Sequence, residues 1–511
     1  MHMETPWWRD AVVYEIYVRS FADASGDGVG DLAGIRERLP YLTELGVDAI
    51  WLTPFYRSPM ADGGYDVADH RDVDPLFGTL ADFDALVAEA HACGLRLLVD
   101  IVPNHSSAEH EWFKAALRGE GRDRYVFRHG GDLPPNNWQS TFGGPAWSRT
   151  PDGQWYLHLF APEQPDFNWR NPEVHAEFLD VLRFWLDRGV DGFRIDVAMG
   201  LYKAEGLPDT PPEGQAFRAE SPIWGRPEVH GVYRQWRTVL DSYPGGRMAI
   251  GEVWTDSAED LARYVRPDEL QQSFNFAWLE APWSATAFRK VIDDTLASVT
   301  APTWVLSNHD VVRHVTRYGE GLTNSTTGLV RARAALLAML ALPGSAYLYQ
   351  GEELGLPEVK DLPPGARQDP IFTRSKGTLA GRDGCRVPLP WSGGAEPYGF
   401  SPDGARPWLP QPIEWTALTA DRQAGDPGST LSFYRQALRA RRALRGSLPG
   451  EITWLDSPDD ALFFARGSMT CVVNCGTGPV PLPPHEHVLI GSAPVDGHLL
   501  PPDTAAWLHT P

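Results

Sequence analysis

The stretch Arg96-Leu97-Leu98-Val99-Asp100-Ile101-Val102-Pro103-Asn104-His105 decides the fold, because an unbroken apolar run ends here in a group of polar residues. Such a run, without polar alternation, is typical of a parallel strand buried on both faces. Charged residues also end apolar runs in Gly192-Phe193-Arg194-Ile195-Asp196, Gly251-Glu252-Val253-Trp254 and Ser307-Asn308-His309-Asp310. Charges at the C-terminal tips of parallel strands meet at the mouth of a barrel.

Strand-like and helix-like segments alternate over most of the chain. Expected strands include residues 12–17, 49–52, 97–102 and 346–349, and expected helices are residues 35–45, 80–92, 173–188 and 429–445. This alternation is typical of a parallel sheet with helical crossovers, and eight such strands close a barrel. The sequence therefore predicts the α/β class and a (β/α)8 TIM barrel.

Two regions break the alternation. After His105, glycine, proline and polar residues continue to about residue 171, which is too long for a simple connection. After residue 445, short alternating runs separated by turn residues predict antiparallel strands. We expect a barrel over residues 1–104 and 172–445, an inserted subdomain after the third strand over 105–171, and a small C-terminal antiparallel β domain, a β-sandwich, over 446–511.

Charge and composition exclude several partners. The 511 residues carry 67 acidic and 45 basic side chains, a net charge of -22, which disfavours nucleic acid and anionic membranes. No apolar run is long enough to span a bilayer. The chain opens without a secretory signal, and four scattered cysteines fit reduced thiols. We expect a cytoplasmic monomer or homodimer.

Further motifs carry a resemblance to a known family. They are the opening run over residues 8–17, the segments 64–70 and 73–79, and Gln164-Pro165-Asp166-Phe167-Asn168. With the four strand ends, their order and spacing resemble the α-amylase family, glycoside hydrolase family 13, and within it the α-glucosidase and oligo-1,6-glucosidase branch. The resemblance covers nearly the whole chain. It implies an enzyme that needs no cofactor for its chemistry and acts on a small oligosaccharide or disaccharide.

Two strand ends supply the carboxyl groups that this chemistry needs. Retaining hydrolysis of an α-glycoside uses an ionised nucleophile and a protonated acid about 5 Å apart. Asp196 follows Arg194 by two residues, so both side chains point to one face of a strand and the guanidinium would keep the carboxylate ionised. Glu252 has apolar neighbours that favour the protonated form. We predict Asp196 as nucleophile and Glu252 as general acid and base, as the resemblance also implies.

The resemblance implies further roles. Asp310 would be a third catalytic carboxylate that binds sugar hydroxyls and helps distort the ring, and His105 and His309 would donate hydrogen bonds to that ring. Tyr65 offers an aromatic platform. The expected substrate-binding residues are Tyr65, Asp66, His105, Phe167, Arg194, His309 and Arg386.

One ion pair would make the enzyme exo-acting. In exo-acting members of the family, a motif arginine pairs with the acid after the tyrosine and blocks the pocket behind the non-reducing glucose. The segment 381–388 contains two arginines, and we expect Arg386 rather than Arg382 to pair with Asp66. An ordinary surface ion pair is the competing interpretation.

The residue after the expected nucleophile bears on linkage. In this branch valine there tends to accompany α-1,6 cleavage and threonine α-1,4 cleavage. Val197 favours α-1,6 bonds slightly, because exchanging a methyl for a hydroxyl shifts preference only modestly. The linkage stays open at this stage.

A loop near the start has the composition of a calcium site. Oxygen-bearing residues alternate with glycines, as hard cations prefer. It lacks the terminal glutamate of an EF-hand, and Ser25 stands where relatives usually carry Asn or Asp. A solvated acidic turn is the alternative to a structural Ca²⁺. The expected ligands are Asp23, Ser25, Asp27, Val29 and Asp31.

These observations favour a retaining α-glucosidase that cleaves terminal α-1,4 or α-1,6 bonds of short oligosaccharides. One alternative is a transglucosylase or isomerase, such as a trehalose synthase or sucrose isomerase, which shares the covalent intermediate but passes glucose to a sugar. A second is a non-catalytic barrel that serves as a carrier or transporter subunit. Those relatives typically lose catalytic carboxylates and carry a membrane anchor, and this sequence shows neither feature.

Overall fold

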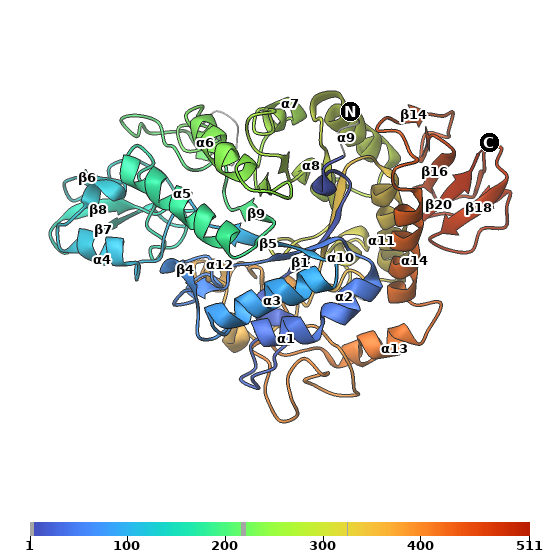
Figure 1. The fold of residues 1–511 in the computed structure, drawn as a ribbon, viewed down its shortest axis with the longest axis horizontal. Coiled ribbons are helices and arrows are strands. Elements are labelled where there is room, and N and C mark those ends of the chain that lie inside the picture. The colour runs from blue at the N-terminus through green and yellow to red at the C-terminus, as the bar shows by residue number, and fades with distance from the viewer. Residues whose placement is uncertain (1–4, 216–220, 324, 511) are drawn as a thin grey trace.

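A computed structural model describes residues 5–215, 221–323 and 325–510 (Figure 1). The expectation that the chain opens without a secretory signal rests partly on residues 1–4, which lie outside the described residues. None of the described helices is long and apolar enough to cross a membrane.

Eight parallel strands form the central sheet, which confirms the predicted barrel class. They are hydrogen-bonded in the order β11-β10-β9-β5-β2-β1-β13-β12. At the two ends of this order, Thr303 Oγ1 of β12 donates to the carbonyl of Ser273 of β11 over 2.6 Å, so the sheet nearly closes. In chain order the strands are β1 (Val12–Ile16), β2 (Ala49–Leu52), β5 (Arg96–Ile101), β9 (Gly192–Ile195), β10 (Met248–Gly251), β11 (Gln272–Ser273), β12 (Thr303–Val305) and β13 (Ser345–Tyr349).

Helices follow the strands, as the alternation predicts. The expected helix over residues 35–45 is two helices that meet at Arg38, because Pro40 lies in the first turn of the second and cannot continue the ladder of the first. The helices around the barrel are α1 (Leu32–Glu37), α2 (Leu39–Leu45), α3 (Leu80–Ala92), α5 (Pro172–Asp187), α6 (Val229–Asp241), α7 (Ala258–Ala262), α8 (Phe276–Glu280), α9 (Ala285–Ser298), α10 (His314–Tyr318), α11 (Thr326–Ala341), α12 (Pro370–Arg374), α13 (Ala420–Ala424) and α14 (Thr430–Leu444).

An additional segment separates β5 from α5, and Figure 1 shows it at one end of the molecule. It contains α4 (Glu111–Leu117) and a small antiparallel sheet in the order β6-β8-β7. The strands are β6 (Phe127–His129), β7 (Trp147–Arg149) and β8 (Gln154–Leu157). A hairpin of β3 (Tyr56–Arg57) and β4 (Asp69–Val73) follows β2. The insertion after the third barrel strand is thus present as predicted.

A five-stranded antiparallel sheet ends the chain at the opposite side of Figure 1. Its order is β14-β15-β16-β20-β18, and α11 packs against β20 and β16. A two-stranded sheet of β17 and β19 accompanies it. The strands are β14 (Thr453–Trp454), β15 (Ala461–Arg466), β16 (Met469–Asn474), β17 (Val480–Pro481), β18 (His487–Gly491), β19 (Leu499–Leu500) and β20 (Thr504–His509).

Candidate active site

The alternation of side-chain direction along the barrel strands brings the charged residues at the strand ends together. Val13, Leu98 and Ile250 belong to the apolar cluster that fills the barrel interior. Because side chains repeat on one face every two residues, Glu15, Asp100 and Glu252 continue these inward rows at the C-terminal end. A cavity of about 200 Å³ lies beside these tips and is lined by Asp62, Tyr65, His105, Thr141, Phe142, Phe160, Asp196, Val197, Glu252, Trp254, Asp310, Ile371 and Arg382.

Arg194 joins the carboxyl groups of three neighbouring strands. Its Nη1 lies 2.6 Å from Asp196 Oδ1 and 3.0 Å from Asp100 Oδ1, while its Nη2 lies 2.7 Å from Glu252 Oε2. The Arg194 side chain is only 3% exposed. One buried guanidinium therefore fixes the positions of both carboxyl groups that the sequence predicts for the chemistry.

This cluster holds more negative charge than its arginine can offset. Burial raises the pKa of Asp196 well above its ordinary value; Arg194 opposes the rise, while Glu252 and Asp100 add to it. Burial likewise raises the pKa of Asp100 to about 7. The expectation that Arg194 alone keeps Asp196 ionised is too simple, because the guanidinium serves three carboxyl groups. The cluster as a whole therefore favours retaining a proton near neutral pH.

Glu252 is held from two sides. Its Oε2 accepts a hydrogen bond from the backbone N–H of Val197 over 3.0 Å, and its Oε1 accepts one from Trp254 Nε1 over 3.0 Å. Val197 has a φ of 44°, a left-handed conformation that is costly for a β-branched residue. The strained turn after Asp196 thus aims a backbone donor at the Glu252 carboxyl group.

His309 and Asp310 form a second group beside the first. His309 Nδ1 lies 2.5 Å from Glu15 Oε1, and its Nε2 lies 2.7 Å from the Tyr65 hydroxyl. Burial lowers the pKa of His309 well below its ordinary value, so the ring is neutral. Asp310 Oδ1 accepts a hydrogen bond from Arg386 Nη2 over 2.7 Å. Burial alone would raise the pKa of Asp310, but the surrounding positive groups outweigh burial and lower it, so this carboxylate stays ionised.

The expected pairing of Asp66 with Arg386 is wrong. The pair at the cavity is Asp62 with Arg382, whose Nη2 lies 2.6 Å from Asp62 Oδ1. Arg382 also contacts Asp310, with Nη1 3.1 Å from Oδ1. Arg386 instead donates from Nε to the carbonyl of His309 over 2.8 Å and orients Asp310.

Asp66 is buried under the loop that carries Asp62. Its carboxylate accepts hydrogen bonds from Ser58 Oγ and from the backbone N–H groups of Ala61 and Asp62, each over 2.9 Å. Burial raises the pKa of Asp66 to about 6. Asp66 therefore organises the loop, and Asp62 faces the cavity in its place.

Phe167 is a packing residue, which corrects its predicted contact with substrate. Its ring stacks on Tyr125, with centroids 5.0 Å apart, and meets Phe178 of α5 edge-on. It forms an isolated bridge with Tyr125, and the preceding Asp166 bridges to His105. Because neighbours in an extended segment point to opposite sides, Asp166 lies toward the barrel tips and Phe167 points into the inserted segment.

Tyr65 and His105 do line the cavity. The Tyr65 hydroxyl lies 3.0 Å from Asp100 Oδ2, and its ring stacks on His309 at an interplanar angle of 6°. His105 Nε2 lies 3.2 Å from the carbonyl of Tyr65, and burial lowers the pKa of His105 to about 4. Both side chains are thus ordered by the cluster before any sugar arrives.

Sequence reasoning missed several residues of this site. Asp62 and Arg382 each lie four residues before the residue predicted for the ion pair, and Glu15 and Asp100 lie in predicted strands without a predicted role. Inward alternation along β1 and β5 could have identified the last two. In the apolar wall, Phe142 and Phe160 come from irregular segments, whose side-chain directions no periodicity predicts, and Ile371 comes from the five-residue helix α12.

The proposed calcium loop is ordered by hydrogen bonds of its own. Asp23 Oδ1 accepts from the backbone N–H of Gly26 over 2.7 Å, and Asp31 Oδ1 accepts from that of Gly34 over 2.6 Å. In the described part of the chain, Asp23, Asp27 and Asp31 do not bring carboxylate oxygens within 4.8 Å of one another as a set. The donor types fit Ca²⁺. Calcium there stays a prediction.

Relatives cover most of this chain. It is 41% identical over 490 residues to a probable α-glucosidase of Rhizobium meliloti (strain 1021), covering 90% of this chain and 87% of that protein. It is 36% identical over 484 residues to an oligo-1,6-glucosidase of Parageobacillus thermoglucosidasius, covering 86% and 84%.

Solved structures agree with the fold. The α-glucosyl transfer enzyme XgtA matches with a TM-score of 0.89 at 40% identity, covering 99% of this chain and 100% of that chain. The isomaltulose synthase of Klebsiella sp. LX3 matches with a TM-score of 0.90 at 31% identity and the same coverage. The family described as "Alpha amylase, catalytic domain" matches residues 15–446. The chain therefore belongs to the α-amylase family and is a glycoside hydrolase family 13 enzyme.

Proposed function

We propose that the protein is a retaining, exo-acting α-glucosidase that removes glucose from the non-reducing ends of short oligosaccharides. The observation that carries this proposal is the Asp62–Arg382 pair beside Asp196 and Glu252 in a cavity of about 200 Å³. This volume is below the usual range for pockets that hold drug-sized ligands, and it suits one sugar ring better than a chain. The ion pair would close the cavity behind that ring.

The two carboxyl groups of the site can perform a double displacement. An Asp196 oxygen attacks the anomeric carbon, the glycosidic C–O bond breaks, and the leaving oxygen takes a proton from Glu252. In the second step a water oxygen attacks the same carbon, Glu252 takes the water proton, and the Asp196 carboxylate leaves. The first step needs the Asp196 carboxylate ionised and the Glu252 carboxyl group protonated when substrate is bound.

Two sugar products test this proposal. Maltotriose should yield glucose and maltose, and NMR within the first minutes should show the released glucose as the α-anomer. Initial release of β-glucose would contradict retention. Release of maltose from the non-reducing end of a longer chain, without free glucose, would contradict the removal of single glucose units.

A second candidate is transfer of glucose to a sugar acceptor. Its support comes from similar solved structures, which include XgtA and a trehalulose synthase. An apolar wall at the cavity, with Trp254 stacked on Phe276 at 3.9 Å between centroids, could disfavour water in the second step. Product analysis on sucrose separates the two: hydrolysis gives glucose and fructose, whereas isomerisation gives a new disaccharide.

A further inference from the structure

A cavity larger than the candidate active site lies at the other end of the barrel. It has a volume of about 720 Å³, against about 200 Å³ at the candidate active site. Its lining includes residues just before β1, β12 and β13, at the N-terminal ends of the barrel strands. The end of α14 and strands of the C-terminal sheet complete it. The cavity therefore lies between the barrel and the C-terminal sheet.

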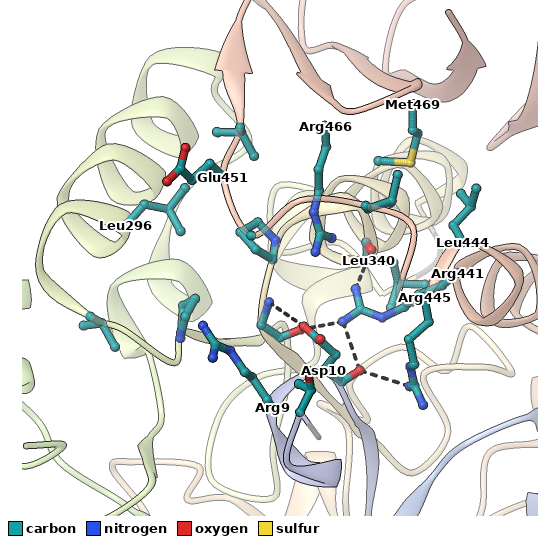
Figure 2. A pocket seen from close by; sticks show the side chains of 18 of the residues that line it. Arg9, Asp10, Leu296, Leu340, Arg441, Leu444, Arg445, Glu451, Arg466 and Met469 are labelled. Carbon is teal, nitrogen blue, oxygen red and sulfur yellow. Dashed lines mark hydrogen bonds between the residues drawn. The ribbon is translucent and has the colours of Figure 1, made fainter. Parts of the chain in front are cut away.

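Arginines dominate the charged lining of this cavity. Figure 2 shows Arg466 descending from the C-terminal sheet and Arg9 rising from the segment before β1, with Arg441 beside them. Arg441 and Arg466 are 7% and 9% exposed. Burying a guanidinium costs free energy unless an anion or several acceptors compensate it. In a chain with a net charge of -22, this local concentration of positive charge is unexpected.

Backbone carbonyls accept hydrogen bonds from some of the N–H groups of Arg441 and Arg466. Arg441 donates to carbonyls that include those of Leu340 and Gly344, and Arg466 donates from Nη1 to that of Leu342 over 3.2 Å and from Nε to that of Pro449 over 2.6 Å. Carbonyls at the end of α11 supply roughly half a unit of negative charge by the helix dipole. That is less than the charge of two guanidinium groups.

Carboxylates do not neutralise the remaining positive charge. Arg9, Arg441 and Arg466 form no ion pair with any carboxylate in the described residues, and Asp10 is the acid at their centre (Figure 2). Asp10 offsets one of the three positive charges. Among the other charges that line the cavity, Arg445 pairs with Asp48 and Asp293 with Arg289 at 3.8 Å, while the exposed Glu451 forms no ion pair among the described residues. Burial lowers the pKa of Arg441 to about 10, and repulsion from Arg466 adds to this effect.

Donors remain available to a ligand. The Nη2 of Arg466 has no hydrogen-bond partner among the described residues, and the same holds for the whole guanidinium of Arg9. Guanidinium groups bind phosphate through paired, charge-assisted hydrogen bonds. Beside them, Leu296, Ile452 and Trp454 give the cavity an apolar wall that suits the body of a small molecule.

We propose that this cavity binds a phosphate group, free or carried by a small metabolite, between Arg9 and Arg466. The bound anion would also bridge the barrel to the C-terminal sheet, because the two arginines come from these two parts. Binding would therefore raise the melting temperature as well as saturate in a titration.

Calorimetric titration tests the site with inorganic phosphate, glucose 6-phosphate and uncharged glucose. We expect the affinity of at least one phosphate compound to fall about tenfold or more in Arg9→Gln and Arg466→Gln. Arg9 is exposed, so its variant should fold even if removing Arg466 disturbs the end of α11. The matched control is Arg439→Gln, an exposed arginine of α14 outside the cavity lining, which should bind as the unmodified protein does.

The results separate the sources of the phosphate group. Tighter binding of glucose 6-phosphate than of phosphate indicates an organic ligand, and equal or weaker binding indicates the free anion. Arg382→Gln removes the cation of the other cavity and should leave this binding unchanged. The proposal is overturned by the absence of binding, by binding that Arg9→Gln leaves intact, or by binding that disappears in Arg382→Gln.

Discussion

Arg382 donates a hydrogen bond to Asp62, with its Nη2 2.6 Å from Asp62 Oδ1, although 320 residues separate the two. The Arg382 and Asp62 side chains are 13% and 4% exposed, so this ion pair is shielded from solvent. Arg382 also contacts Asp369 and Asp310. It therefore connects the loop between β3 and β4, which carries Asp62, to the C-terminal ends of the barrel strands. The proposed recognition of a chain end depends on this pair.

Replacing Asp62 by Asn should lower kcat/KM for maltose by about 10- to 100-fold, because Arg382 loses one of its three carboxylate partners and the cavity loses the carboxylate proposed to bind the end of the chain. The matched control is Asp72→Asn, which removes an acid from the exposed ion pair with Arg57 at 3.2 Å and should change kcat/KM little. Steady-state kinetics on maltose and maltotriose measure both. Equal kinetics in the two variants would show that the pair does not bind substrate.

Replacing Asp196 by Asn should lower kcat by at least about 10³-fold while the protein stays folded, because the change removes the nucleophile and keeps the volume. Three carboxyl groups crowd around Arg194, and the change removes one of them, which reduces their mutual repulsion. The melting temperature of the variant should therefore not fall. Activity and thermal unfolding are the measurements. Substantial remaining turnover would reject Asp196 as the nucleophile.

The pH dependence of stability should report the buried cluster. Because the pKa of Asp100 is raised by burial from 3.8 to about 7, protonation favours the folded state. This contribution is complete below about pH 4 and is lost as pH rises through 7. Asp100→Asn removes it, so the stability of the original protein relative to the variant should fall by a few kcal/mol (on the order of one per pH unit) from pH 4 to 7. Denaturant unfolding at several pH values measures this, and parallel curves would contradict it.

Calcium should stabilise the loop that contains Asp23 and Asp27. We expect millimolar Ca²⁺ to raise the melting temperature of chelator-treated protein by about 1 to 2 °C, the effect of about 1 to 2 kcal/mol in a chain of 511 residues. Asp27 is exposed, so Asp27→Ala should remove this response without preventing folding. Equal effects of Ca²⁺ and Mg²⁺, or no effect, would leave the loop as a solvated acidic turn.

Inward alternation explains which parts of the site the sequence could predict. Arg194, Asp196 and Glu252 end regular strands, where a period of two determines direction, and the structure brings them together. Irregular loops carry Asp62, Asp66, Arg382 and Arg386. In such loops the direction of each side chain depends on the geometry of its turn, so nearby acids or arginines can point in different directions. The sixth barrel strand, β11, spans two residues, too few for any periodicity.

Replacing Val197 by Thr tests linkage preference. Both residues are β-branched, so the variant keeps the strained backbone at a φ of 44° and the N–H that donates to Glu252. Val197 lines the cavity, and a hydroxyl there should favour α-1,4 over α-1,6 bonds. We expect the ratio of kcat/KM for isomaltose to that for maltose to fall by about 3- to 10-fold, a shift of the size that one small group produces in a pocket. The control is Val253→Thr, a buried valine one residue beyond Glu252, which should not change the ratio even if it lowers stability. An unchanged ratio in Val197→Thr would place the linkage determinant elsewhere in the cavity wall.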